Sequence, residues 1–103
     1  MVVYLSGIHD NTDENEILRL KIHLLNLGCT IITPEDKELE KHSWSENLRL
    51  RMNFLQSSSA IYMIPNWKES VMARIELTVA MDDSMPQCFS TEDIKELITT
   101  LDG

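Results

Sequence analysis

Residues 2–33 read VVYLSGIHDNTDENEILRLKIHLLNLGCTIIT, with an apolar run at each end. The first run is rich in β-branched and aromatic residues and stops at Ser6-Gly7, which is typical of a buried strand followed by a tight turn. Thr12-Asp13-Glu14 offers an N-cap and two acids for a first helical turn, and Gly28 is the expected C′ residue. An apolar stripe of helical spacing lies between them: Ile17, Leu20, Leu24 and Leu27. The stretch therefore predicts a β-α-β unit.

The alternation of helices and strands continues beyond this unit. Residues 34–43 are polar and of mixed charge, which predicts a solvated loop with room for one helical turn. The pattern then favours a helix from Trp44 to about Gln56, a third strand at Ala60–Ile64 and a short fourth strand at Pro86–Phe89. The chain is therefore expected to alternate strand and helix four times.

Two further helices are expected to begin at serine N-caps, Ser70 and Ser90. Their expected buried faces are Ala73, Leu77, Ala80 and Met81 in the first and Ile94, Leu97, Ile98 and Leu101 in the second. Alternating strands and helices predict a single α/β domain over residues 1–103, in three layers, with helices on both faces of a four- to five-stranded parallel sheet. Ligands of such sheets bind outside the carboxyl ends of the strands, here residues 6–9, 33–35 and 65–70.

Composition restricts the partners of this domain. Acidic side chains number 17 against 9 basic ones, giving a formal net charge of −8, which repels a nucleic-acid polymer but leaves local binding of one phosphate open. No apolar run is long enough to span a bilayer and no basic leader precedes the first strand, so we expect a cytoplasmic protein without membrane contact. Cys29 and Cys88 are expected to be reduced, partly buried thiols.

Glu76 is the most informative candidate for chemistry. It lies six residues after Ser70, in a helix whose other residues are largely apolar. Burial there would raise its pKa, as happens for many functional carboxylates. The alternative is a structural role, in which Glu76 faces solvent or pairs with Arg74 or Lys68.

Weaker candidates surround the predicted ligand edge. Gly7 allows a close backbone approach to a ligand, and His9 is either a ligand contact or plain surface. Trp44 and Trp67 either stack on a base or pack in the protein. The histidines and cysteines have no metal-ligand spacing, and the chain contains no P-loop or dinucleotide fingerprint, so neither a metal nor an organic cofactor is expected.

Four segments are similar to one known family: VYLSG at 3–7, GCTIITP at 28–34, AIYMIPNW at 60–67, and Ser70-x-x-Ala73-x-x-Glu76-x-x-x-Ala80. Over residues 2–86 the chain resembles a phage- and prophage-associated family of small domains in the nucleoside 2-deoxyribosyltransferase-like superfamily. That superfamily also contains the deoxynucleoside 5′-monophosphate N-glycosidases. The resemblance implies a Rossmann- or flavodoxin-like sandwich that binds a nucleoside or nucleoside monophosphate.

The resemblance also implies roles for individual residues. Glu76 matches the glutamate that attacks the sugar C1′ and releases the base, and Ser70 matches the position that holds the sugar 5′ end or its phosphate. The implied substrate-binding set is Tyr4, Ser6, Gly7, Ile8, His9, Arg51, Asn66, Trp67 and Ser70. Proteins of this superfamily complete their sites across a subunit interface, which implies a homodimer or larger assembly.

Three positions depart from the family pattern. Met72 replaces a glycine two residues after the serine, and Ser59 stands where relatives carry an aspartate before the third strand. Counting back from the third strand, Arg51 occupies the place of an aspartate beside the nucleophile. If the loop before that strand differs in length by one residue, Met52 occupies this place instead. An arginine does not give up its proton, so it would pair with Glu76 or with a phosphate.

These departures leave more than one function open. The first is an N-glycosidase or deoxyribosyltransferase-like enzyme that uses Glu76. The second is a nucleotide-binding module without turnover, for example a phage accessory protein that senses or sequesters a nucleotide. A structural or interaction domain is the third. A second acid near Glu76, from Asp10, Asp13 or Glu46, would favour the enzyme, whereas a salt bridge between Glu76 and Arg51 would favour the binding module.

Overall fold

The computed structural model describes residues 1–8, 12–33 and 43–102. The elements in this part of the chain are β1 (Val2–Ser6), α1 (Glu14–Asn26), β2 (Thr30–Ile32), α3 (Trp44–Gln56), β3 (Ala60–Met63), the 3₁₀ helix η1 (Trp67–Glu69), α4 (Val71–Asp82), β4 (Gln87–Cys88) and α5 (Thr91–Asp102). The predicted alternation of strands and helices is confirmed. The predicted loop at residues 34–43 lies outside the described residues except for Ser43.

The four strands form one parallel sheet in the order β2-β1-β3-β4. The chain starts in the middle of the sheet, moves outward to β2, then returns to the other side of β1 for β3 and β4. Strand order therefore reverses between β1 and β3, the switch point at which open α/β sheets bind ligands. The carboxyl ends of these two strands are paired there, with Ser6 beside Met63.

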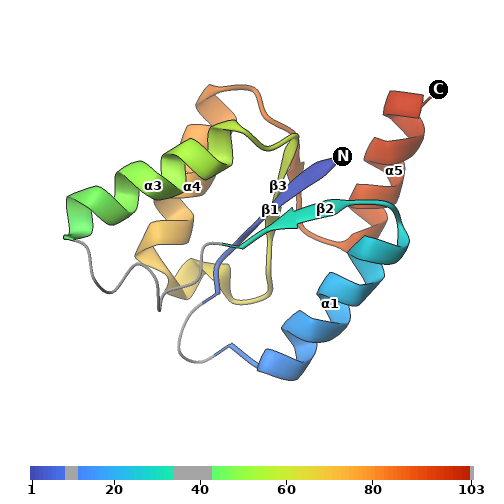
Figure 1. The fold of residues 1–103 in the computed structure, drawn as a ribbon, viewed down its shortest axis with the longest axis horizontal. Coiled ribbons are helices and arrows are strands. Elements are labelled where there is room, and N and C mark those ends of the chain that lie inside the picture. The colour runs from blue at the N-terminus through green and yellow to red at the C-terminus, as the bar shows by residue number, and fades with distance from the viewer. Residues whose placement is uncertain (9–11, 34–42, 103) are drawn as a thin grey trace.

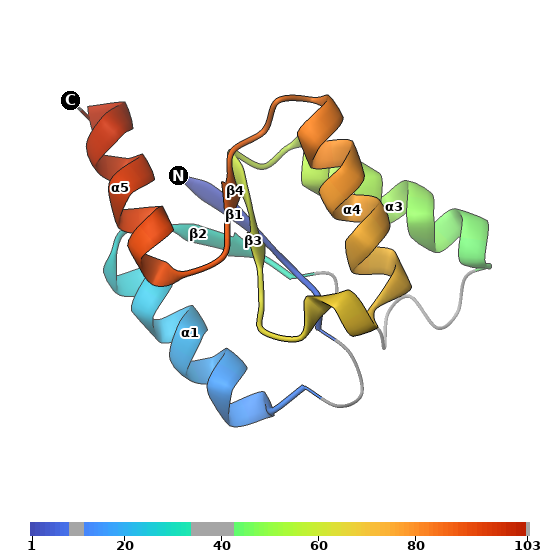
Figure 2. The same ribbon diagram turned by 180° about the vertical axis from the view of Figure 1, so that it is seen from behind.

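Helices cover both faces of the sheet, as predicted: α1 and α5 on one face, α3 and α4 on the other (Figure 1; Figure 2). Side chains of a strand point alternately to the two faces. Thus Val3 and Leu5 of β1 enter the core under α1 and α5, whereas Tyr4 enters the core under α3 and α4. The result is the three-layer α/β sandwich expected from the sequence.

Serine and aspartate caps fix where the helices begin. Asp13, rather than the earlier candidate Thr12, caps α1, because its Oδ1 accepts a hydrogen bond from the Asn15 amide at 2.9 Å. Ser70 caps α4 as predicted: its Oγ accepts from the Ala73 amide at 3.2 Å. The caps place the first turn of α4 at the carboxyl edge of the sheet, directly after β3 and η1.

Some details differ from the sequence-based expectation. Met81 was expected on the buried face of α4 but is 56% exposed, because Ala73, Glu76 and Ala80 face the sheet. Cys29 and Cys88 form no disulfide within the described residues, and both are buried rather than partly buried. Within the described residues, every helix is too short or too polar to cross a bilayer.

Candidate functional site

Glu76 lies in the second turn of α4 and has no solvent exposure. It occupies the face of the helix that packs on the sheet, between the small residues Ala73 and Ala80. The alternative in which Glu76 faces solvent is therefore wrong, and the ion pair that the structure shows for its carboxylate is with Arg51 rather than with the exposed Arg74 or Lys68. An ionisable group buried among apolar neighbours is costly, so the side chains around its carboxylate define the site.

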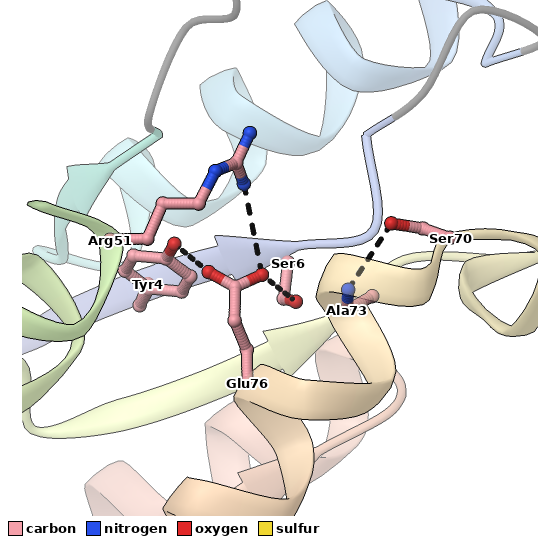
Figure 3. Close-up of polar contacts among 6 residues, drawn as sticks. All are labelled: Tyr4, Ser6, Arg51, Ser70, Ala73 and Glu76. Atoms are coloured by element: carbon pink, nitrogen blue, oxygen red, sulfur yellow. Dashed lines mark hydrogen bonds and ion pairs between the residues drawn. The ribbon is translucent and has the colours of Figure 1, made fainter. Parts of the chain in front are cut away.

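Two residues of β1 hold this carboxylate. Tyr4 and Ser6 are two positions apart on the strand, so both side chains point to the α4 face. The Tyr4 hydroxyl donates to Oε2 of Glu76, and the Ser6 Oγ donates to Oε1 at 2.9 Å (Figure 3). Each carboxylate oxygen thus receives a neutral hydrogen-bond donor from the central strand.

A cation approaches the same carboxylate from α3. The Nη1 atom of Arg51 lies 3.8 Å from Oε1 of Glu76, and the Arg51 side chain is only 13% exposed (Figure 3). A salt bridge between these two side chains is the feature expected of a binding module. Tyr4, Ser6, Arg51 and Glu76 come from three elements and meet at the switch point of the sheet.

The electrostatics of Tyr4 assign its proton. Burial raises the pKa of the Tyr4 hydroxyl far above its ordinary range, and the negative charge of Glu76 and the hydrogen bond to it raise the pKa further. The nearby Arg51 cation acts in the opposite direction with a smaller effect. Tyr4 therefore stays protonated at physiological pH and acts as a donor to Glu76 rather than as an acid that gives its proton away.

The first turn of α4 forms the next part of the edge. Ser70 is half-buried, and its oxygen accepts the Ala73 amide, so its hydroxyl hydrogen remains able to donate to a ligand. Met72 is half-buried in the same turn. The dipole of the helix favours an anion near this end.

Gly7 is needed for packing against the loop after β3. It adopts a φ of +104°, and an added Cβ would lie 2.7 Å from Cβ of Trp67 and 3.0 Å from Cγ1 of Ile64. The predicted close approach at Gly7 is thus made to Trp67, within the protein. Ile8, next along, packs against the core under α1 and α5.

The remaining predicted residues lie around this edge or outside the described part. Asn66 is exposed in the left-handed conformation at the start of η1. Half-buried Trp67 packs on the core under α3 and α4. His9, Asp10 and the side chain of Trp44 lie outside what the structure describes. Of the other acids considered, Asp13 is an exposed cap of α1 and Glu46 is exposed in the first turn of α3.

Ser59, the other family departure, has a structural role at the opposite end of the sheet. Its amide donates to the carbonyl of Val2 at 2.7 Å, and its Oγ accepts from the Val2 amide at 3.2 Å. These bonds join the amino ends of β1 and β3. Ser59 therefore contributes to strand pairing and lies away from the ligand edge.

Sequence reasoning missed Asn47 and Phe89. Asn47 lies one helical turn before Arg51 on α3, and among the described residues its buried Oδ1 receives no hydrogen bond. Phe89 follows β4 at the carboxyl edge, half exposed, with its ring centroid 6.4 Å from that of Trp67. The signals that could have identified them are the i, i+4 spacing of Asn47 from Arg51 and the position of Phe89 directly after a strand.

A separate shallow groove lies between β4 and α5, with a volume of about 460 Å³. It is lined by Pro86, Gln87, Cys88, Phe89, Asp93, Glu96, Leu97 and Thr100. Its two carboxylates give it an acidic lining. It is thus a poorer fit for an anionic ligand than the edge near Arg51.

Fold and site define a parallel α/β domain with a buried, hydrogen-bonded carboxylate at its switch point. Residues 1–89 match the family model of a domain of unknown function, DUF4406, and the chain belongs to that family. Comparisons with curated proteins and with solved structures returned no match.

Proposed function

We propose that this domain binds a nucleoside or nucleoside 5′-monophosphate at the carboxyl edge of β1 and β3, as a member of the nucleoside 2-deoxyribosyltransferase-like superfamily. The observation that carries the proposal is the buried Glu76 carboxylate, held by Tyr4 and Ser6 at the switch point and paired with Arg51. A protein gains little stability from a buried ion pair, so such a cluster at a ligand edge is better explained by binding.

The chemistry of the edge suits the parts of a mononucleotide. Sugar hydroxyls are donors and acceptors that match a carboxylate, a guanidinium and the Ser70 hydroxyl. A phosphate matches the start of α4 and the Arg51 cation. Trp67 and Phe89 supply aromatic surface for a base on the neighbouring strands β3 and β4.

The second candidate is an N-glycosidase in which Glu76 is the nucleophile. A carboxylate oxygen would form a bond to C1′ as the bond from C1′ to the base nitrogen breaks, and the base would leave with the electron pair and need a proton. Water would then displace the carboxylate and release the sugar. The fixed orientation of Glu76 by Tyr4 and Ser6 favours this candidate.

Two features of the site favour binding over turnover. Arg51 occupies the place where related enzymes carry an aspartate, and a guanidinium does not supply the proton that the leaving base needs. Tyr4 retains its proton because its pKa is raised by burial and by Glu76. The cluster therefore orients and neutralises Glu76 without offering a general acid.

The test uses a panel of 2′-deoxynucleosides and their 5′-monophosphates, with wild-type protein, Glu76→Gln, and Glu96→Gln as a control at an exposed carboxylate on α5. We expect at least one compound to raise the melting temperature of the wild type and of Glu96→Gln, with the increase reduced in Glu76→Gln. Chromatography of the same mixtures is expected to show no free base.

Two outcomes would contradict the proposal. Base release by the wild type that is lost in Glu76→Gln would establish the glycosidase instead. If no compound either stabilises the protein or loses its base, the domain is not a nucleotide-binding module.

The same resemblance leads us to propose a homodimer or larger assembly. Leu18, Ile22 and Leu25 form an outward-facing apolar row on α1, about half exposed each, opposite the face that packs on the sheet. Apolar rows of this kind are often covered in an oligomer. Light scattering coupled to size-exclusion chromatography gives the assembly mass directly.

A further inference from the structure

β4 is the outer strand of the sheet, with β3 on one side of it and no strand of the described chain on the other (Figure 2). The Ile61 amide of β3 donates to the Pro86 carbonyl at 3.0 Å, so the backbone of Pro86 faces β3. Because alternate residues of a parallel strand bond to opposite sides, the N–H and C=O of Gln87 point away from the sheet. Among the described residues, neither group has a backbone partner on that outer side.

The outer edge of β4 opens into the groove that separates the strand from α5. The Phe89 amide, the next one on this side, donates to Oδ2 of Asp93 in the first turn of α5 at 2.8 Å. Residues 86–89 line one wall of the groove, and positions 93, 96, 97 and 100, which share one face of α5, line the other. An open strand edge beside a helix face is a geometry to which extended peptides add as a further strand.

The charge of the groove indicates the chemistry of its occupant. Asp93 and Glu96 each bring a carboxylate, and the residues that line the groove include no lysine or arginine. Glu96 is exposed, and a carboxylate that accepts one amide, as Asp93 does, still has room for a further donor. The net charge of −8 attracts cations from a distance. Half-buried Leu97 and half-exposed Phe89 add apolar surface, so a basic segment with apolar side chains fits the groove.

A second copy of this chain is a poorer occupant of the same edge. Pairing two β4 strands would bring the Asp93 and Glu96 carboxylates of both copies together, on two molecules that each carry a net charge of −8. Like charges brought together at an interface are costly. Acidic side chains beside a short edge strand therefore act against self-pairing while they favour a partner of opposite charge.

We propose that β4 and α5 form a docking groove for an extended, basic segment of a partner protein, which adds to the sheet as a strand through the backbone of Gln87. Alternate side chains of an extended strand lie about 6–7 Å apart, close to the roughly 5–6 Å between residues three apart on a helix. Cations at alternate positions of the segment therefore pair with Asp93 and Glu96. Because β4 has only two residues, its edge offers few hydrogen bonds, and the complex is weak and sensitive to salt.

The experiment titrates a capped peptide of sequence TVKVKVT into ¹⁵N-labelled wild-type protein at low salt and follows the ¹H–¹⁵N NMR spectrum. The largest amide shifts are expected at Gln87 and Phe89 and along α5 between positions 93 and 100, and the affinity should fall as salt is added. The same peptide with glutamates in place of both lysines should bind at least about tenfold more weakly, because it loses the charge-assisted contacts.

Two variants test the strand edge and the charge separately. Gln87→Pro removes the outward N–H, and the sheet should tolerate a proline there because this amide does not bond to β3. Glu96→Lys reverses one carboxylate of the groove. Each variant should weaken binding of the lysine peptide about tenfold or more. The control, Asp82→Lys, changes the net charge by the same amount at an exposed residue that ends α4, and it should bind like wild type.

Several results would overturn the proposal. These are the absence of shifts at millimolar lysine peptide, shifts outside the groove, and equal binding of the glutamate peptide. Equal weakening by Glu96→Lys and Asp82→Lys would show only attraction to a negative molecule, and undiminished binding by a folded Gln87→Pro would exclude strand addition. If Gln87→Pro does not fold, Glu96→Lys and its control still decide. Shifts of the same amides with protein concentration alone would assign the edge to a second copy instead.

Discussion

The Oγ atom of Ser6, the last residue of β1, donates a 2.9 Å hydrogen bond to Oε1 of Glu76 in the second turn of α4. This bond joins the carboxyl end of the central strand to the helix that forms the ligand edge, across 70 positions of sequence. Both residues are buried, so the bond is shielded from water. It fixes the carboxylate before any ligand arrives, which is the preorganisation that binding and catalysis both require.

Ser6→Ala removes this bond and leaves a buried carboxylate oxygen with less compensation. We expect a loss of about 1.5–3 kcal/mol in the free energy of unfolding, because the bond involves a charged acceptor. Urea denaturation followed by circular dichroism measures the change. Thr99→Ala on the exposed side of α5 serves as the control and should stay within about 0.5 kcal/mol of wild type. A Ser6→Ala protein as stable as the control would show that the bond contributes nothing.

Gly7→Ala and Gly28→Ala form a matched pair, since both glycines have positive φ. A Cβ at Gly28 meets nothing within 4 Å, so that change should cost only the roughly 1–2 kcal/mol of left-handed backbone. At Gly7 the new atom collides with Trp67 and Ile64, which should add about 1–3 kcal/mol. Melting curves of the two variants give the comparison, and equal destabilisation would contradict the packing role of Gly7.

Arg51 and Glu76 should show strong energetic coupling. Arg51→Gln leaves Glu76 buried without its counterion, which should cost up to about 3–5 kcal/mol of stability. The double variant Arg51→Gln/Glu76→Gln removes both charges and should be more stable than the sum of the single changes predicts. A double-mutant cycle by chemical denaturation measures the difference, and additive effects would show that the two side chains do not interact.

Alkaline pH should destabilise the protein through its buried thiol. Burial raises the pKa of Cys88 from 9.0 to about 11, so the folded state keeps the thiol proton while the unfolded state begins to lose it. The resulting stability is fully present below pH 9 and is lost as pH rises towards 11. Unfolding free energies across this window should fall for the wild type and fall less for Cys88→Ala. At pH 8, native Cys88 should resist alkylation by iodoacetamide until the chain is unfolded.

The sequence was sufficient for the fold because its local signals agree with one another. Apolar runs bounded by turn residues predicted β1 and β3, and serine caps predicted the starts of α4 and α5. The exposure of Met81 was not predictable from helical spacing alone. Small residues at Ala73 and Ala80 let α4 lie close to the sheet, and that approach determines which side of the helix is buried.

The site was only partly predictable from the sequence, because side chains from different elements meet there through tertiary packing. The strand ends mark the ligand edge and so included Ser6, whereas Tyr4 was expected there only from the family resemblance. The pairing of Arg51 with Glu76 was likewise expected only from the resemblance, because it depends on the packing of α3 beside α4 and no local spacing encodes that contact. Phe89 also meets Trp67 only through tertiary packing.

The central claim is that a mononucleotide binds at the carboxyl edge of β1 and β3. An ¹H–¹⁵N NMR titration of labelled protein with the four 2′-deoxynucleoside 5′-monophosphates tests it most directly. The largest amide shifts are expected at Gly7 and Ile8 and between Asn66 and Ala73. Shifts confined to the groove between β4 and α5, or no shifts at millimolar ligand, would contradict it.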